Sequence, residues 1–227
     1  MFDLSFSNAA TPKSMESKNP KNLKTDSIST ILDSLNIPPN AQICGIDEAG
    51  RGCVAGSMFV CGVILDKLPS SLKNSLKDSK TLSQKRRDAI ADTLKDYAEF
   101  KLVKKEAHVI DTQGLSVCIK ESLQEILSAF NAPFYVFDGN CNFSIPHLKT
   151  LIKGDSKLHA ISAASILAKN AKDTEMQNLA QLFPQYDFAK NKGYGTKAHI
   201  QAITTHGLSP VHRRSYRIKS LDSATLF

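Results

Sequence analysis

From about residue 42 onward, short apolar stretches alternate with longer segments of helical periodicity, and this alternation limits the fold more than any other feature of the chain. Apolar runs that end at turn residues are typical of strands, whereas apolar residues three and four positions apart are typical of amphipathic helices. The sequence therefore predicts an α/β domain with a mixed sheet and a helical C-terminal part. The expected strands are 43–49, 57–65, 99–106, 134–137 and 148–153, and the expected helices are 84–97, 108–131, 159–182 and shorter pieces around 196–206.

The first 41 residues differ from the rest of the chain in composition. Residues 1–27 are rich in Ser, Asn, Lys and Pro and lack an apolar period, so we expect a largely disordered extension. A short helix is expected over 28–36, before Pro38 and Pro39, and the folded domain is expected to occupy 42–227. No secretory signal and no apolar run of about 20 residues is present, which predicts a cytoplasmic protein without a membrane span.

Positive charge is concentrated near the C-terminus. The formal net charge is +7. From residue 189 onward Asp222 is the only acidic residue, and the basic ones are Lys190, Lys192, Lys197, Arg213, Arg214, Arg217 and Lys219. Charge alone favours equally a solvated basic surface and a surface that binds a polyanion such as nucleic acid.

Acidic residues stand at the ends of three expected strands. Asp47 and Glu48 are adjacent, Asp138 follows four apolar residues, and Asp155 follows Gly154. The ends of strands gather at one edge of an α/β sheet, and carboxylates that converge there repel one another unless a cation balances them. Oxygen ligands without paired His or Cys suit Mg²⁺ or Mn²⁺ rather than zinc. Two such ions about 4 Å apart can cleave a phosphodiester bond.

Each acid also has a purely structural interpretation. Asp138-Gly139 is a frequent turn dipeptide, and Asp155 alone would equally be a turn residue. Asp47 and Glu48 are harder to explain in this way, because adjacent strand residues point to opposite faces of a sheet. A bend or bulge at Ala49-Gly50 would bring both carboxylates to one site.

The stretch GIDEAGRG at 45–52 resembles the signature opening of the ribonuclease HII family, the type 2 ribonucleases H. Five later blocks resemble the same family in the same order: DSKTLS at 78–83, VFDG at 136–139, KGD at 153–155 followed by ISAASILAK at 161–169, KGYGTKAH at 192–199, and HGLSPVHRRSY at 206–216. The resemblance covers about residues 42–217.

The resemblance implies a ribonuclease H-like fold, with a mixed central sheet flanked by helices, and an endonuclease activity. Such an enzyme cuts the RNA strand of RNA–DNA hybrids and cuts duplex DNA 5′ of single ribonucleotides, leaving 3′-hydroxyl and 5′-phosphate ends. It also implies that Asp47, Glu48, Asp138 and Asp155 are the catalytic acids and hold two Mn²⁺ or Mg²⁺ ions. We expect a monomer. Some relatives bind a sliding clamp, and the C-terminal LDSATLF is a weak candidate for such a contact.

Substrate contacts are expected at a second group of residues. By resemblance, Gly50-Arg51-Gly52 reads the 2′-hydroxyl and the neighbouring phosphate, and Tyr194 packs on the sugar of the next deoxynucleotide. Glycines let the backbone approach a sugar, and only the 2′-hydroxyl distinguishes RNA from DNA at one nucleotide. The charge distribution adds Lys197, Arg213 and Arg214 as candidates for binding the nucleic-acid backbone.

Three alternative functions remain to be weighed. A non-catalytic metal-dependent scaffold would leave the Gly50-Arg51-Gly52 loop unexplained. A type 3 ribonuclease H or a DNA junction resolvase would share the fold, but Arg51 between two glycines, together with Tyr194, favours type 2. A catalytically silent nucleic-acid-binding module would have lost an acid, and all four are present. The chain departs from the family at Lys172, where Arg is usual, and at 157–159, which makes fine substrate contacts less predictable. His199, His206 and His212 are interpreted as structural or phosphate-adjacent residues and not as metal ligands.

Overall fold

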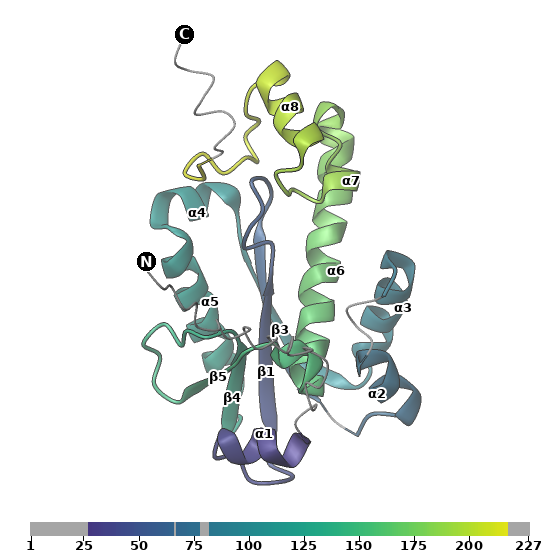
Figure 1. Ribbon diagram of the computed structural model, residues 1–227, viewed down its shortest axis with the longest axis vertical. Coiled ribbons are helices and arrows are strands. Elements are labelled where there is room, and N and C mark those ends of the chain that lie inside the picture. The colour runs from purple at the N-terminus through teal and green to yellow at the C-terminus, as the bar shows by residue number, and fades with distance from the viewer. Residues whose placement is uncertain (1–26, 66, 78–81, 218–227) are drawn as a thin grey trace, which may run out of the picture.

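The computed structural model describes residues 27–65, 67–77 and 82–217. Within these residues, one five-stranded sheet has the order β3-β2-β1-β4-β5 (Figure 1). Its strands are β1 (Ile43–Ala49), β2 (Met58–Leu65), β3 (Ala98–Lys105), β4 (Phe134–Asp138) and β5 (Leu148–Leu151). The β1, β2 and β3 strands pair antiparallel, whereas β1, β4 and β5 pair parallel. The predicted mixed sheet is therefore confirmed.

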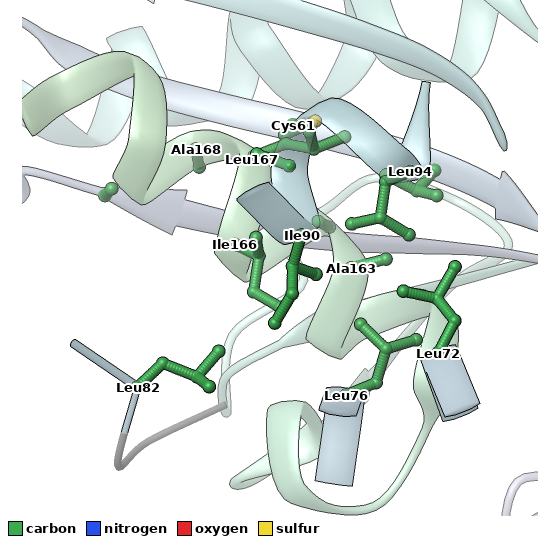
Figure 2. Close-up of a cluster of buried hydrophobic side chains, with 14 of the residues drawn as sticks. Cys61, Leu72, Leu76, Leu82, Ile90, Leu94, Ala163, Ile166, Leu167 and Ala168 are labelled. Carbon is green, nitrogen blue, oxygen red and sulfur yellow. The ribbon is translucent and has the colours of Figure 1, made fainter. Parts of the chain in front are cut away.

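Helices cover both faces of the sheet. The longest, α6 (His159–Leu182), packs against β1 and β2, and α2 (Ser70–Lys77) and α3 (Gln84–Leu94) lie on its outer side (Figure 1). Leucine and isoleucine side chains of α2 and α3 meet small and branched side chains of α6 in one buried cluster, which Figure 2 shows. The opposite face is covered by α5 (Leu115–Ala129), whose apolar side chains pack against β2 and β3.

A glycine in β1 allows α6 to lie unusually close to the sheet. A Cβ atom added at Gly45 would come within 2.4 Å of the backbone of Ala160 and Ile161. Since real Cβ atoms do not approach backbone so closely, any side chain here would push the start of α6 away. The close contact sets the position of α6 relative to the carboxyl end of β1, where Asp47 and Glu48 stand.

The prediction of one continuous helix over 108–131 is wrong. The structure has α4 (Ala107–Gln113) and α5, separated by Gly114, whose φ of 86° no helix accommodates. Helical periodicity continues across this break, but glycine permits the positive φ that ends the first helix. The sequence reading also missed α2, which is only 8 residues long and buries Leu72 and Leu76.

The packed part of the chain begins before residue 42. The helix α1 (Ile28–Ser34) forms as predicted, with the Ser27 hydroxyl accepting a hydrogen bond from the Thr30 N–H. Ile31 and Ile37 are buried in a cluster with side chains of β4 and β5. Residues 1–26, for which a disordered extension is predicted, and the C-terminal LDSATLF lie outside the described residues.

The C-terminal part packs beside the turn between β1 and β2. It contains α7 (Phe188–Asn191) and α8 (Lys197–His206), which lie near the end of α6 (Figure 1). The backbone N–H of Val54 donates to the Gly193 carbonyl at 2.8 Å, and Ala55 forms an isolated bridge with His212. Within the described residues, no helix is long and apolar enough to cross a membrane.

Candidate active site

Asp47 and Asp138 stand at the same level on neighbouring parallel strands. The register pairs Ile46 of β1 with Phe137 of β4, so the next residue on each strand is one of the two acids. Asp138 is the last residue of β4 and not, as expected, the residue after the strand. The carboxyl ends of adjacent parallel strands therefore bring these two predicted site residues together.

Asp155 is tied to this pair through the backbone. It lies in the short 3₁₀ helix Gly154–Ser156, directly after the β5 strand and its turn. The N–H groups of Gly154 and Asp155 donate to the two carboxylate oxygens of Asp138, at 3.0 and 3.3 Å. The Asp138 side chain thus anchors the turn that carries Asp155, and both acids belong to one edge of the sheet.

The Asp47 and Glu48 carboxylates are mostly buried, and their charges are poorly balanced. Burial raises the pKa of Asp47 to about 7, and the neighbouring charge of Glu48 adds to the shift. Burial also raises the pKa of Glu48, against the opposing charge of Arg51. One oxygen of Glu48, Oε2, is buried without a hydrogen-bond partner. A buried carboxylate oxygen that lacks a donor is a free ligand position.

These residues fit a hard divalent cation. The donor set consists of carboxylate oxygens, which Mg²⁺ and Mn²⁺ prefer, and the orphaned Glu48 oxygen is available to such an ion. Among the described residues, no three His, Cys, Asp or Glu side chains lie close enough together to coordinate one metal ion in this arrangement. Asp138 helps to explain this, because both of its oxygens accept backbone hydrogen bonds. Like charges also keep unneutralised carboxylates apart.

Helix α6 supports Asp47 from one face of the sheet. Ser165 forms a side-chain hydrogen bond with Asp47, which lowers the pKa of that carboxyl against the effect of burial. The Lys169 ammonium group donates in turn to the Ser165 hydroxyl at 2.8 Å. These two α6 residues therefore form a polar chain behind the Asp47 carboxylate.

The loop Gly50–Gly52 begins where β1 ends. Of the bend or bulge considered at Ala49-Gly50, no bulge forms, because pairing with β2 runs without interruption to Ala49, and the chain turns directly after Gly50. Gly50 has a φ of 89°, and a Cβ atom there would lie 2.7 Å from the Ser57 carbonyl oxygen. A Cβ at Gly52 would meet nothing within 4 Å, so this side of the loop is open. Arg51 is 55% exposed and its guanidinium lies 3.6 Å from the Glu48 carboxylate.

Tyr194 lies beside this loop and remains 47% exposed. The Lys172 ammonium group sits 4.8 Å from the centre of its ring, and Cys53 forms a side-chain hydrogen bond with its hydroxyl. Lys172 is itself buried and also donates to the Lys192 carbonyl at 3.4 Å. Sequence reasoning missed Lys172 and Cys53 as neighbours of Tyr194. The only sequence feature that pointed to Lys172 was its departure from the family pattern, which usually has Arg at this position.

The three predicted backbone-binding residues have different positions. Lys197 is exposed at the first turn of α8, where the helix dipole also favours anions. Arg214 is exposed, and its backbone N–H donates to the Asp111 carboxylate at 2.8 Å. Arg213 is only 1% exposed, so its side chain faces the interior and not a surface that a phosphate could reach. Its expected direct contact with the substrate does not fit this burial.

Comparisons with known proteins find relatives over most of the chain. The family model described as Ribonuclease HII matches residues 44–219. A ribonuclease HII of Sulfurovum sp. (strain NBC37-1) is 45% identical over 185 residues, which cover 82% of this chain and 96% of the relative. A ribonuclease HII of Helicobacter pylori (strain G27) is 48% identical over 189 residues, which cover 79% of this chain and 93% of the relative.

Solved structures show the same fold. The ribonuclease HII of Archaeoglobus fulgidus, solved in a complex with PCNA, has a TM-score of 0.66 and is 26% identical, with 80% of this chain and 99% of that chain covered. The ribonuclease H2 of Pyrococcus horikoshii OT3 also has a TM-score of 0.66, with 23% identity and coverage of 78% and 94%. The predicted ribonuclease H-like fold is confirmed.

Proposed function

The chain belongs to the ribonuclease HII family and is a ribonuclease H endonuclease, and we propose that it cuts duplex DNA on the 5′ side of a single embedded ribonucleotide. It acts on nucleic acid, and its family depends on divalent metal ions. We propose that the cut leaves 3′-hydroxyl and 5′-phosphate ends, and that the same site hydrolyses the RNA strand of RNA–DNA hybrids.

One observation carries the proposal for a single ribonucleotide. The open side of Gly52, the exposed Arg51 and the half-exposed ring of Tyr194 lie next to one another and beside the acids. A loop without side-chain bulk can approach a 2′-hydroxyl, the guanidinium can contact a phosphate, and the tyrosine ring can pack on a sugar. These are the contacts needed to recognise one ribonucleotide followed by a deoxynucleotide.

Four carboxylates would hold the metal ions: those of Asp47, Glu48, Asp138 and Asp155. Two Mg²⁺ or Mn²⁺ ions bound there would supply an activated water and neutralise charge on the leaving 3′ oxygen. The protein itself positions the ligands: Ser165 orients Asp47, and Asp138 fixes the turn that carries Asp155. The orphaned Oε2 of Glu48 would be available to such an ion.

The experiment uses three labelled substrates of the same sequence: a DNA duplex with one ribonucleotide, an all-DNA duplex and an RNA–DNA hybrid. Each is incubated with the protein and Mg²⁺ or Mn²⁺, and with EDTA as a control. A single cut 5′ of the ribonucleotide that EDTA abolishes is the expected result. Cutting of the hybrid alone would contradict the proposed specificity and would favour a type 1 or type 3 activity.

Association with a sliding clamp is a separate proposal. Its support is the relative from Archaeoglobus fulgidus that was solved in a complex with PCNA. The candidate contact segment, LDSATLF, lies outside the described residues. A pull-down with a clamp, comparing the full chain with one that ends at residue 217, tests this segment directly. The expected monomeric state and cytoplasmic location likewise stay predictions.

A further inference from the structure

The carbonyl oxygen of Arg51 is held from the inner side of the loop by two side chains of the C-terminal segment. The Arg213 guanidinium donates to it through Nη1 at 3.1 Å, and the Tyr216 hydroxyl donates to it at 2.7 Å. The same Nη1 donates to the Tyr216 oxygen at 3.0 Å, while Nε donates to the Gly56 carbonyl at 3.0 Å. One guanidinium therefore reaches carbonyl groups at both ends of the β1–β2 turn.

Backbone pairing places Arg213 under this turn. The Arg213 N–H donates to the Val54 carbonyl at 2.8 Å, and the Gly56 N–H donates to the Val211 carbonyl at 2.9 Å. The segment 211–213 thus runs along the turn in the manner of a short strand. This pairing sets the position of the Arg213 side chain, whose guanidinium carbon lies over the Tyr216 ring, 5.1 Å from the ring centre.

Stability alone explains this arrangement poorly. Arg213 is 1% exposed, and its Nη2 is buried without a hydrogen-bond partner. The oxygens that it contacts belong to carbonyl groups and a hydroxyl, which carry no full charge. A buried cation with an unpaired donor destabilises the fold, and an apolar residue of similar size would avoid this cost. A role in shaping the loop accounts for both carbonyl contacts.

The contacts determine which way the Arg51–Gly52 peptide faces. The peptide is trans, so its carbonyl and its N–H point in opposite directions. Because the Arg51 carbonyl is turned inward, the Gly52 N–H is turned toward the open side of the loop. Among the hydrogen bonds of the described residues, that N–H has no partner. It is a free donor at the place where Gly52 leaves room for a sugar.

We propose that Arg213 and Tyr216 are positioning residues that hold the Arg51–Gly52 peptide with its N–H toward the 2′-hydroxyl of the substrate ribonucleotide. The inference rests on the proposed function, because it concerns how the same loop recognises its sugar. A 2′-hydroxyl can accept this hydrogen bond, whereas a deoxyribose offers no oxygen at that position. Loosening the peptide therefore reduces the preference for ribose more than it reduces binding to DNA in general.

The test measures affinity for two duplexes that differ in a single 2′-hydroxyl. The full-length protein is titrated into each labelled duplex in EDTA, so that no cleavage occurs, and the dissociation constants are compared by fluorescence anisotropy. Tyr216→Phe removes one donor to the Arg51 carbonyl and keeps the ring against Arg213. Arg213→Lys keeps the charge and loses the fork that reaches two carbonyl groups.

Tyr135→Phe is the matched control. The Tyr135 hydroxyl donates to the Phe130 carbonyl at 2.6 Å and to the Leu127 carbonyl at 3.2 Å, and Tyr135 pairs with Cys44, at the end of β1 away from the loop. The same atom is removed, and the same kind of hydrogen bond is lost. Thermal unfolding of all variants shows how far each loss affects stability alone.

The wild-type protein is expected to bind the ribose-containing duplex more tightly, and Tyr216→Phe and Arg213→Lys are expected to reduce this ratio about three- to tenfold, the effect of about one hydrogen bond. Tyr135→Phe is expected to keep the wild-type ratio even where its melting temperature falls. If the wild type prefers ribose and folded Tyr216→Phe keeps the full ratio, the positioning role is wrong. If the wild type neither prefers ribose nor cuts at it, the proposed function fails and this inference fails with it.

Discussion

The Nε2 atoms of His199 and His212 lie 3.0 Å apart in the interior, where both side chains are at most 1% exposed. The Ser209 N–H donates to His212 Nδ1 at 2.9 Å, so the proton of His212 is on Nε2 and donates to His199. His199 then carries its proton on Nδ1, which donates to the Tyr194 carbonyl at 2.8 Å. The two neutral rings connect the C-terminal segment to the loop that presents Tyr194.

The histidine pair predicts a loss of stability in acid. Burial lowers the pKa of His212 to about 4, and the neighbouring His199 and Arg214 act in the same direction. Burial also lowers the pKa of His199. The unfolded chain binds protons near pH 6.5 and the folded protein does not, so the free energy of unfolding falls as the pH drops from about 6.5 toward 4.

His212→Gln isolates this contribution, because glutamine offers one acceptor and one donor but does not titrate. We expect the variant to be less stable than the wild type at pH 7 and the gap to narrow at pH 5. Urea unfolding at both pH values measures the gap, and effects of other titrating groups largely cancel in the difference. Around the pair, Tyr186 and Phe188 contribute uncharged rings, and the exposed His206 provides the control His206→Gln. A difference in unfolding free energy between wild type and His212→Gln that does not change with pH would contradict the lowered pKa of His212.

Asp47→Asn is expected to stabilise the metal-free protein at pH 8 while abolishing cleavage. The pKa of Asp47 is about 7 in the folded protein, above its ordinary value of 3.8. The folded state therefore favours the protonated carboxyl, and the stability that this carboxyl contributes is complete below about pH 4 and is lost as the pH rises through 7. An amide stays neutral and still accepts the Glu48 N–H hydrogen bond. The melting temperature in EDTA is the measurement.

Three further results should accompany this gain. It should disappear near pH 4, where the wild-type carboxyl is protonated. Added Mg²⁺ or Mn²⁺ should raise the melting temperature of the wild type more than that of Asp47→Asn, because binding to the folded state stabilises it. Asp92→Asn, at an exposed position of α3, should show neither effect. A melting temperature of Asp47→Asn below that of the wild type at pH 8 would show that the Asp47 charge does not destabilise the folded protein.

Asp138→Asn is expected to lower the cleavage rate at least about 10³-fold, since removing one member of a catalytic unit has effects of this size or larger. The amide also replaces one oxygen that accepts a backbone N–H from the 154–155 turn with a donor, so the position of Asp155 is disturbed as well. Single-turnover cleavage of a duplex with one ribonucleotide is the measurement, with circular dichroism to confirm folding. Turnover near the wild-type rate would remove Asp138 from the metal site.

The pattern of apolar residues was enough to predict most of the sheet and the bounds of α6, but not how the site is supported. The run from Ile43 to Ala49 has the expected strand bounds, because strand propensity and burial favour the same structure there. The break at Gly114 was missed because helical periodicity is unaffected by one residue with positive φ. Arg213 was misplaced because charge counting cannot tell a surface cation from a buried one whose partners, at Arg51 and Gly56, are remote in sequence.

Lys172→Met is expected to weaken substrate binding through Tyr194. The ammonium group lies over the half-exposed Tyr194 ring, and a cation–π contact at such a site is worth about 1 kcal/mol. We therefore expect KM to rise about three- to tenfold with a smaller change in kcat, since the proposed contact of the ring is with the sugar and not with the scissile bond. Lys172→Arg, which keeps the cation, should restore most of the loss. Equal effects of Met and Arg would mean that packing and not charge matters at this position.

Lys197 and Arg214 are expected to set the salt dependence of binding, because both side chains are exposed in the C-terminal region, where basic residues are concentrated. Neutralising a side chain that contacts one phosphate reduces the slope of log Kd against log salt by about 1. Lys197→Gln and Arg214→Gln should each do so while leaving the preference for ribose unchanged. The Arg214 N–H keeps its hydrogen bond with Asp111 in this variant, so the local backbone is preserved.

Arg86→Gln provides the control for this measurement, because Arg86 is an exposed cation on α3, outside the C-terminal segment. Its slope should equal that of the wild type. Anisotropy titrations at four salt concentrations, in EDTA, give the slopes directly. A normal slope for Arg214→Gln with a reduced slope for Arg86→Gln would move the nucleic-acid path from the C-terminal segment to α3. In that case the basic residues near the C-terminus would form a solvated surface that does not bind nucleic acid, which is the second interpretation that the charge distribution allows.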